Sequence, residues 1–354
     1  MYIDCHVHCR DEEQSYKETI AHALEVARDS GIDAIFDMPN PFRPVFNEQR
    51  VKERLALAQQ ANVHGVLYKV FLGLTKNREQ IKRAVEIYDT FFPKVIGMKL
   101  YAGHSTGELG VIGVEDQATV YLTLSQERYN GVLFVHAEKE KEMNEHIGAK
   151  FNPSIPISHC LSRPWRAEVE SIKDQINLAK QYNFKGKLHI AHISHPKSVD
   201  LVFEARKELD ISCGVCPHHL FYDWNQMFTE QGIMWKMNPP LRSPGTNLSM
   251  IEYLRHGKID WIESDHAPHD PQKDKLKHPF ASGITGLAHW PLFAELLRYN
   301  NFSEEKIRNV TFDNIANRFG IDIKHTSRPI KDRRNDYPFN FYTSLEKKIE
   351  WKGN

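Results

Sequence analysis

Short β-rich runs alternate with helical stretches along most of this 354-residue chain, and no other pattern in the sequence limits its fold as strongly. The alternation predicts a parallel sheet whose strands are joined by helical crossovers, such as the amphipathic segments Glu48–Ala61 and Arg166–Tyr182. Eight runs can be counted, as expected for a closed (β/α)₈ barrel. The predicted strands are Tyr2–His6, Asp33–Met38, Gly65–Leu72, Val95–Tyr101, Gly131–His136, Lys187–His192, Ile211–Cys216 and Ile259–Ser264.

A doubly wound open sheet would show the same alternation, but it usually carries a glycine-rich phosphate loop after its first strand. Neither a G-x-G-x-x-G motif nor a Walker loop occurs here. We therefore expect one barrel over residues 1–320, with long, structureless functional connections at 217–257 and 266–286. Residues 321–354 lack clear periodicity, and we expect them to pack on the barrel as a tail without a separate β-sandwich domain.

The equal numbers of acidic and basic residues limit the classes of binding partner that we expect. Lys and Arg together number 46, as do Asp and Glu, so no positive excess favours nucleic acid or an anionic membrane surface. No apolar run reaches the length of about 20 residues that a membrane span needs, and the first residues do not resemble a signal peptide. We therefore expect a cytoplasmic protein that acts on a small molecule. The five cysteines are expected to be reduced thiols, and the CxxC pair Cys213 and Cys216 is interpreted as strand packing in preference to a zinc site.

Two histidines and a lysine are the first candidates for metal ligands. His6 and His8 are two residues apart in the first predicted strand, so alternation places them on one face, together with Asp4 and Arg10. A lone HxH pair is equally compatible with packing. Lys99 would point inward from the fourth strand, where carboxylation by CO₂ would convert a repelled ammonium into an anionic ligand that bridges two metals. A lysine that extends to solvent is the alternative.

Three further strands end in residues that can bind metals. His136 ends the fifth strand, and His192 is assigned to the inward face of the sixth, which leaves His189 to pack against helices and His195 in a loop. Asp265 stands at the end of the eighth strand, where barrel enzymes keep their catalytic groups. Four imidazoles, a lysine and an aspartate would then converge at the C-terminal ends of the strands. This ligand set suits zinc or a similar divalent ion.

The motifs HVHCR, MKLY, VHAE, AHIS and SDHAPH resemble the metal-site motifs of the amidohydrolase superfamily, and within it the sequence is most similar to the dihydroorotases. The motifs MPNPFRP, CPHHLFYD and MNPPLRS extend the resemblance from residue 4 to about residue 290. The resemblance implies reversible, metal-dependent hydrolysis of the cyclic amide of L-dihydroorotate to N-carbamoyl-L-aspartate, a step of de novo pyrimidine biosynthesis. It also implies two Zn²⁺ ions as cofactors.

The resemblance implies a role for each residue of the site. Carboxylated Lys99 would bridge the two metals, while Asp265 would complete the more buried site and carry the proton to the leaving ring nitrogen. The implied histidine ligands are His6 and His8 at the more buried metal and His136 and His192 at the more exposed one. The implied substrate contacts are Arg10, Asn40 and His269 at the carboxylate, Asn238 at the ring, and Ser105 and Thr106 in a loop that closes over the substrate. His218 and His219 remain unassigned, with a supporting or packing role favoured.

Two alternatives stay open. A dihydropyrimidinase, hydantoinase or allantoinase would share the metal ligands, but Arg10 beside the HxH motif favours a substrate that carries a carboxylate over their neutral rings. A non-catalytic scaffold for a transcarbamoylase is disfavoured because the sequence keeps every ligand. The resemblance leaves open both a homodimer and an association with an aspartate transcarbamoylase.

Overall fold

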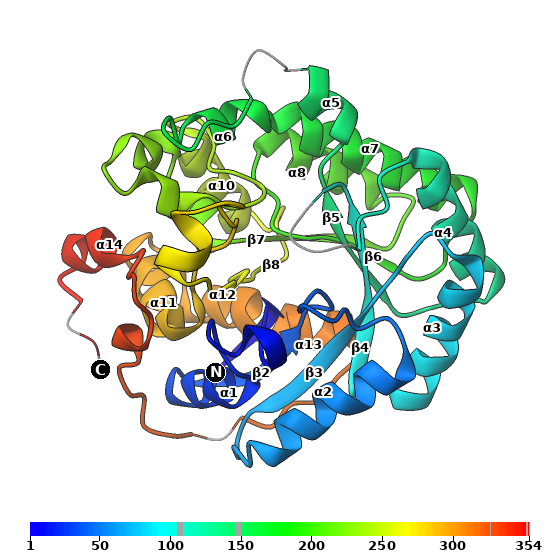
Figure 1. Cartoon of the computed structure of the whole chain (residues 1–354), viewed down its shortest axis with the longest axis horizontal. Coiled ribbons are helices and arrows are strands. Elements are labelled where there is room, and N and C mark those ends of the chain that lie inside the picture. Colours follow the sequence, from blue (N-terminus) through cyan, green and yellow to red (C-terminus); the bar gives the residue numbers. More distant parts are fainter. Residues whose placement is uncertain (105–108, 146–149, 326, 352, 354) are drawn as a thin grey trace.

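A single parallel sheet organises the chain in the structure, a computed structural model that describes residues 1–104, 109–145, 150–325, 327–351 and 353. Its eight strands lie in consecutive order, and they curl around a centre with helices outside them (Figure 1). Val7 pairs in parallel with His266, so the chain that follows the eighth strand returns to the first. The strands are β1 (Tyr2–Val7), β2 (Ile32–Asp37), β3 (Leu67–Gly73), β4 (Val95–Ala102), β5 (Val132–Ala137), β6 (Lys187–Ile190), β7 (Ile211–Val215) and β8 (Trp261–Ile262).

All eight predicted strands are confirmed, each within two residues at either end. The strand β8 has only two residues, because the chain after Ile262 leaves the ladder with β7 and turns toward β1. The arrangement is TIM-barrel-like, as the alternating pattern predicted.

The helices follow the predicted amphipathic pattern. In α3, the Asn77 side chain accepts hydrogen bonds from two backbone N–H groups of the first turn, and Ile81 and Val85 are buried one helical turn apart. The two crossover helices predicted from the sequence are confirmed as α2 and α7. The helices are α1 (Ile20–Asp29), α2 (Glu48–Gln60), α3 (Arg78–Phe91), α4 (Val114–Gln126), α5 (Glu140–Glu145), α6 (Ser158–Ser162), α7 (Trp165–Gln181), α8 (Pro196–Ala205), α9 (Pro217–Phe221), α10 (Thr246–Arg255), α11 (Trp290–Tyr299), α12 (Glu304–Arg308), α13 (Asn314–Phe319) and α14 (Thr343–Lys348).

Aromatic side chains fill the interior of the sheet at one end. Phe36 of β2, Phe134 of β5 and Trp261 of β8 are buried in one cluster. Phe319 of α13 joins this cluster, with its ring 4.9 Å from that of Phe36. The helix α13 lies at the N-terminal ends of the strands, where Lys187 Nζ at the start of β6 donates to the carbonyl of Arg318 across 2.8 Å. Space for a ligand therefore remains at the C-terminal ends.

The connection after β7 is not structureless, in contrast to the prediction. It contains α9, the 3₁₀ helices η3 (Trp224–Phe228) and η4 (Gly232–Trp235), and α10. Local capping explains part of this order, since the Asp223 side chain accepts from the backbone N–H of Asn225 at the start of η3.

The segment beyond residue 320 packs on the outside of the sheet near α1. Arg328 Nε donates to the carbonyl of Arg28 across 2.9 Å. Tyr337 OH donates to Glu18 Oε1 across 2.7 Å, and Glu18 Oε2 lies 3.0 Å from His266 Nε2. The segment thus reaches, through Glu18, the place where the chain after β8 meets β1. Within the described residues, no helix has the length and apolar character that a membrane crossing requires.

Candidate active site

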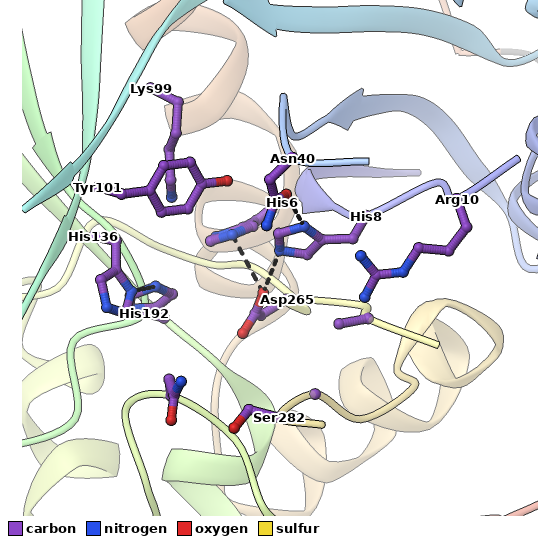
Figure 2. Close-up of a pocket in the computed structure, with 13 residues that line it drawn as sticks. His6, His8, Arg10, Asn40, Lys99, Tyr101, His136, His192, Asp265 and Ser282 are labelled. Carbon is purple, nitrogen blue, oxygen red and sulfur yellow. Dashed lines mark hydrogen bonds and ion pairs between the residues drawn. The ribbon is translucent and has the colours of Figure 1, made fainter. Parts of the chain in front are cut away.

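A pocket opens at the C-terminal ends of the strands. It gathers nine of the ten residues that the sequence analysis assigned to metal or substrate and that lie within the described part of the chain. Figure 2 shows their side chains directed toward one shared space, with the pair His136 and His192 on one side and Arg10 on the other. The lining residues are His6, His8, Arg10, Asn40, Lys99, Tyr101, His136, His192, Asn238, Asp265, Ala267, Ser282 and Gly283.

His6, His8 and Asp265 form the first group in the pocket. His8 Nδ1 donates to Asn40 Oδ1 across 2.7 Å, so Nε2 of the neutral ring carries a lone pair. That Nε2 lies 3.0 Å from Asp265 Oδ1, and His6 Nε2 lies 3.3 Å from the same oxygen. Burial holds the pKa of His8 well below its usual value and lowers that of His6 to about 4. A lone pair that faces a carboxyl oxygen at this distance is stabilised by a metal ion or a proton between the two atoms.

His136 and His192 form the second group. His136 Nδ1 lies 3.0 Å from His192 Nε2, and both rings are buried. Burial also holds the pKa of His192 well below its usual value. The ring of His192 lies 5.2 Å from that of His6, measured between centroids, so the two groups are neighbours. Each group therefore presents a pair of imidazole nitrogens to the same small region.

Lys99 lies beside both groups in an environment that disfavours an ammonium ion. The side chain is fully buried, and among the described residues its Nζ has no hydrogen-bond partner. Burial lowers its pKa to about 8, although Glu263 and Asp265 act in the opposite direction. Lys99 therefore loses its proton more easily near neutral pH than an ordinary lysine does.

The sixth strand differs from its predicted orientation. The strand ends at Ile190, and Leu188 and Ile190 pack in the cluster between sheet and helices, so His189 faces the interior instead. The His189 ring stacks on Trp261 with centroids 4.2 Å apart. His192 still reaches the pocket because its backbone adopts a left-handed conformation with φ of 37°, which turns the side chain inward after the strand has ended.

The first strand also departs from simple alternation. Asp4 was predicted to share the inward face, but its Oδ2 accepts from Trp290 Nε1 of α11 across 2.8 Å. Cys5 packs inside the sheet, and His6 also faces inward. A register irregularity between Asp4 and Val7 shifts the alternation and explains this change of face.

Glu263 supports the histidines of the site but was not predicted from the sequence. Its fully buried carboxylate lies 3.3 Å from His6 Nδ1 and 3.3 Å from His189 Nε2. It also accepts from Trp261 Nε1 across 2.9 Å and from the backbone N–H of His192 across 2.6 Å. The spacing of Trp261, Glu263 and Asp265 at every second residue was the signal that could have revealed it. Glu263 fixes His6 with Nδ1 as the donor and leaves Nε2 to face the pocket.

Arg10 lines the pocket with a positively charged side chain. Its side chain is buried, and its Nε donates to the carbonyl of Pro268 across 3.3 Å. Within the described ranges, no carboxylate lies within ion-pair distance of its guanidinium. The structure does not bring His269 into the lining; its Nε2 lies 3.3 Å from Arg10 Nη2 and 3.0 Å from the carbonyl oxygen of Ser282. His269 therefore contacts Arg10 without lining the pocket.

The other predicted substrate contacts are Asn238, Ser105 and Thr106. Asn238 lines the pocket, and its buried Oδ1 has no hydrogen-bond partner among the described residues. Gly283 also lines it, with φ of 140°, and a Cβ there would lie 2.7 Å from the Cβ of Ala267. Ser105 and Thr106 lie outside the described residues.

A curled parallel sheet that gathers two histidine pairs, a buried lysine and an aspartate in one pocket is the arrangement of a cyclic amidohydrolase. No family model matches the chain. The solved L-hydantoinase (dihydropyrimidinase) from Arthrobacter aurescens superimposes with a TM-score of 0.80 and 23% sequence identity, over 94% of this chain and 74% of that one. This likeness shows the shared fold.

Similarity to known protein sequences identifies the family of this chain. A dihydroorotase from Methanosphaera stadtmanae is 30% identical over 329 residues, which cover 91% of this chain and 71% of the relative. A dihydroorotase from Pyrococcus furiosus is 30% identical over 328 residues, covering 91% and 67% of the two chains. The chain belongs to the dihydroorotase family.

Proposed function

We propose that this protein is an active dihydroorotase, which opens and closes the cyclic amide of L-dihydroorotate in de novo pyrimidine biosynthesis. The observation that carries the proposal is the buried Arg10 guanidinium, which lines the same pocket as the histidine, lysine and aspartate groups and has no carboxylate partner in the described residues. A buried cation without an anion is costly unless a ligand supplies one. The carboxylate of dihydroorotate would do so.

The proposal includes two divalent metal ions, with zinc as the expected metal. His6, His8 and Asp265 would hold one ion, His136 and His192 the other, and carboxylated Lys99 would bridge them. The structure supports this because His8 Nε2 faces a carboxylate oxygen with its lone pair, and His192 Nδ1 and Lys99 Nζ have no hydrogen-bond partner among the described residues. When bound, such ions activate water near neutral pH and polarise the carbonyl of the scissile amide.

Carboxylation of Lys99 follows from the same environment. The reaction with CO₂ requires the uncharged amine, and burial lowers the pKa of Lys99 to about 8. The resulting carbamate would exchange a buried cation for an anion that two metals can share.

Asp265 is proposed to move the proton of the reaction. Its carboxylate lies in the pocket within 3.3 Å of His6 Nε2, and burial raises its pKa above the ordinary value. A carboxylate with a raised pKa can take the proton of the attacking water and return it to the ring nitrogen as the C–N bond breaks. The reverse sequence closes the ring.

Arg10 and its neighbours are proposed to hold the substrate by its carboxylate. Asn40 and Asn238 line the pocket as polar groups that can orient the ring. His269 is proposed to position the Arg10 guanidinium, since it lies 3.3 Å from Nη2 and outside the lining.

We expect Glu263→Gln to weaken metal binding about 10- to 100-fold, the usual effect of removing a group that orients a metal-binding histidine. The change replaces the anion beside His6 Nδ1 and His189 Nε2 with a neutral amide. Metal content after dialysis against graded chelator concentrations measures the effect. Glu168→Gln is the matched control, because that carboxylate is also buried but contacts Ser194 and Arg242. Equal metal retention in both variants would contradict the role of Glu263.

We expect Arg10→Ala to raise the KM for L-dihydroorotate about 10- to 100-fold, the equivalent of losing a charge-assisted hydrogen bond. Dihydrouracil, hydantoin and allantoin carry no carboxylate at this position, so any slow turnover of these rings should not change. The measurement compares the four substrates with zinc-loaded wild-type protein, chelator-stripped protein and the variant. Preference of the wild-type protein for a neutral ring, or an unchanged KM in the variant, would overturn the proposed substrate.

A further inference from the structure

A second group of side chains that can bind a metal lies outside the pocket, at the end of β7 and in the first turn of α9. Cys216, His218 and His219 are 0%, 1% and 3% exposed. The Cys216 sulfur and one nitrogen of each imidazole all lie within 4.8 Å of one another. Metal–ligand bonds of about 2.0–2.3 Å place the ligands of a tetrahedral ion roughly 3.3–3.8 Å apart. Small side-chain rotations would therefore bring the three atoms to one ion.

Each of the two imidazoles has a nitrogen lone pair that no hydrogen bond in the described residues uses. His219 Nε2 donates to the carbonyl of Pro239 across 3.1 Å, so Nδ1 carries the lone pair. That Nδ1, like both nitrogens of His218, is buried and has no hydrogen-bond partner among the described residues. Buried polar atoms without partners are rare because each costs free energy. A histidine whose other nitrogen donates to a carbonyl is also the usual form of a metal ligand.

We propose that Cys216, His218 and His219 bind one divalent cation of the zinc type, at a site separate from the pocket. A thiolate with two imidazoles suits zinc or cobalt better than magnesium or calcium. On binding, the Cys216 S–H bond breaks, a sulfur–metal bond forms, and the proton leaves to solvent. This inference does not depend on the proposed function, since none of the three residues lines the pocket.

The position of the group suggests what the ion would do. Cys216 directly follows β7, and the hydrogen bond from His219 joins this turn to Pro239. Pro239 is adjacent to Asn238, which lines the pocket. A cation at this place would fix the long connection after β7 to the sheet, as structural zinc ions do.

Cobalt substitution tests the site without measuring activity. Thiolate ligation of Co²⁺ produces a near-ultraviolet charge-transfer band, and the ligands proposed in the pocket include no sulfur. Metal-free protein loaded with Co²⁺ alone should develop this band. Cys216→Ser should abolish it and lower the bound cobalt by one equivalent. Cys213→Ser, on the strand that precedes Cys216, is the matched control, because its sulfur faces the carbonyl of Lys258 at 3.7 Å. Cys5→Ser controls for the thiol near Glu263.

Absence of the band in wild-type protein saturated with cobalt would overturn the proposal. So would its persistence in Cys216→Ser, or its loss in Cys5→Ser or Cys213→Ser. Should Cys216→Ser fail to fold, His218→Gln serves in its place, since the loss of one imidazole ligand must shift or weaken the band. An unchanged band in His218→Gln would equally refute the site.

Discussion

Asp265→Asn should lower the turnover of L-dihydroorotate by about 10²–10⁴-fold, the usual contribution of a positioned acid–base group. The asparagine keeps an oxygen near His6 and His8, whose Nε2 atoms lie 3.3 and 3.0 Å from Asp265 Oδ1. It removes the group that can take and return a proton. Most of the metal should therefore remain bound while the chemical step is lost. Single-turnover kinetics and metal analysis on the same sample measure the two quantities.

Asp265→Ala separates the two roles of this side chain. It removes the oxygen as well as the proton carrier, so we expect it to lose both turnover and metal. Full activity in Asp265→Asn would refute the proposed proton transfer. Equal loss of metal in both variants would instead show that Asp265 acts only as a ligand.

Lys99→Met should lower turnover by about 10³-fold, because several kcal/mol of charge stabilisation depend on the ions that this residue is proposed to bridge. Methionine preserves the apolar stem against Phe134, whose ring centroid lies 4.7 Å from Nζ, but it cannot react with CO₂. The variant should bind fewer metal ions than the wild-type protein. Elemental analysis and steady-state kinetics measure both effects.

Lys69→Met is the matched control, since Lys69 is another buried lysine on the neighbouring strand β3 and does not line the pocket. Wild-type protein should also regain activity with zinc only when bicarbonate is present, and Lys99→Met should gain nothing from bicarbonate. Normal metal content and turnover in Lys99→Met would refute the bridging role.

The sequence pattern was sufficient to locate the strands and most of the pocket. Periodicity identifies a strand wherever the chain alternates between two environments, and β5 is an example, with Val132 and Phe134 inside the sheet and His136 in the pocket. The direction of a side chain could not be predicted where the backbone leaves regular geometry. Asp4 and His189 were assigned to the wrong faces because β1 carries a register irregularity and β6 ends two residues early.

Contacts between distant segments were also beyond prediction. The spacing from Asp265 could place Glu263 on the same face, but its contacts with His6 of β1 and His189 of β6 join segments far apart in the sequence. The contact of His269 with Arg10 depends on how the connection after β8 folds back. This connection is held by Lys275 Nζ, which donates to the carbonyl of Gly283 across 2.7 Å. Motif spacing gives residue types, while tertiary packing decides which of them meet.

Contacts of β1 and of Glu18 with the last third of the chain affect the order and the rate of folding. Asp4 contacts Trp290, 286 positions away, and Glu18 contacts Tyr337, 319 positions away. During synthesis, the N-terminal strand therefore emerges long before these partners exist, and the edge of β1 that will meet the chain after β8 stays unprotected. Such distant contacts slow folding because a long loop must close before they contribute. His8 is translated 257 positions before Asp265, the residue that it faces in the pocket, so the pocket can form only after that intervening stretch has left the ribosome.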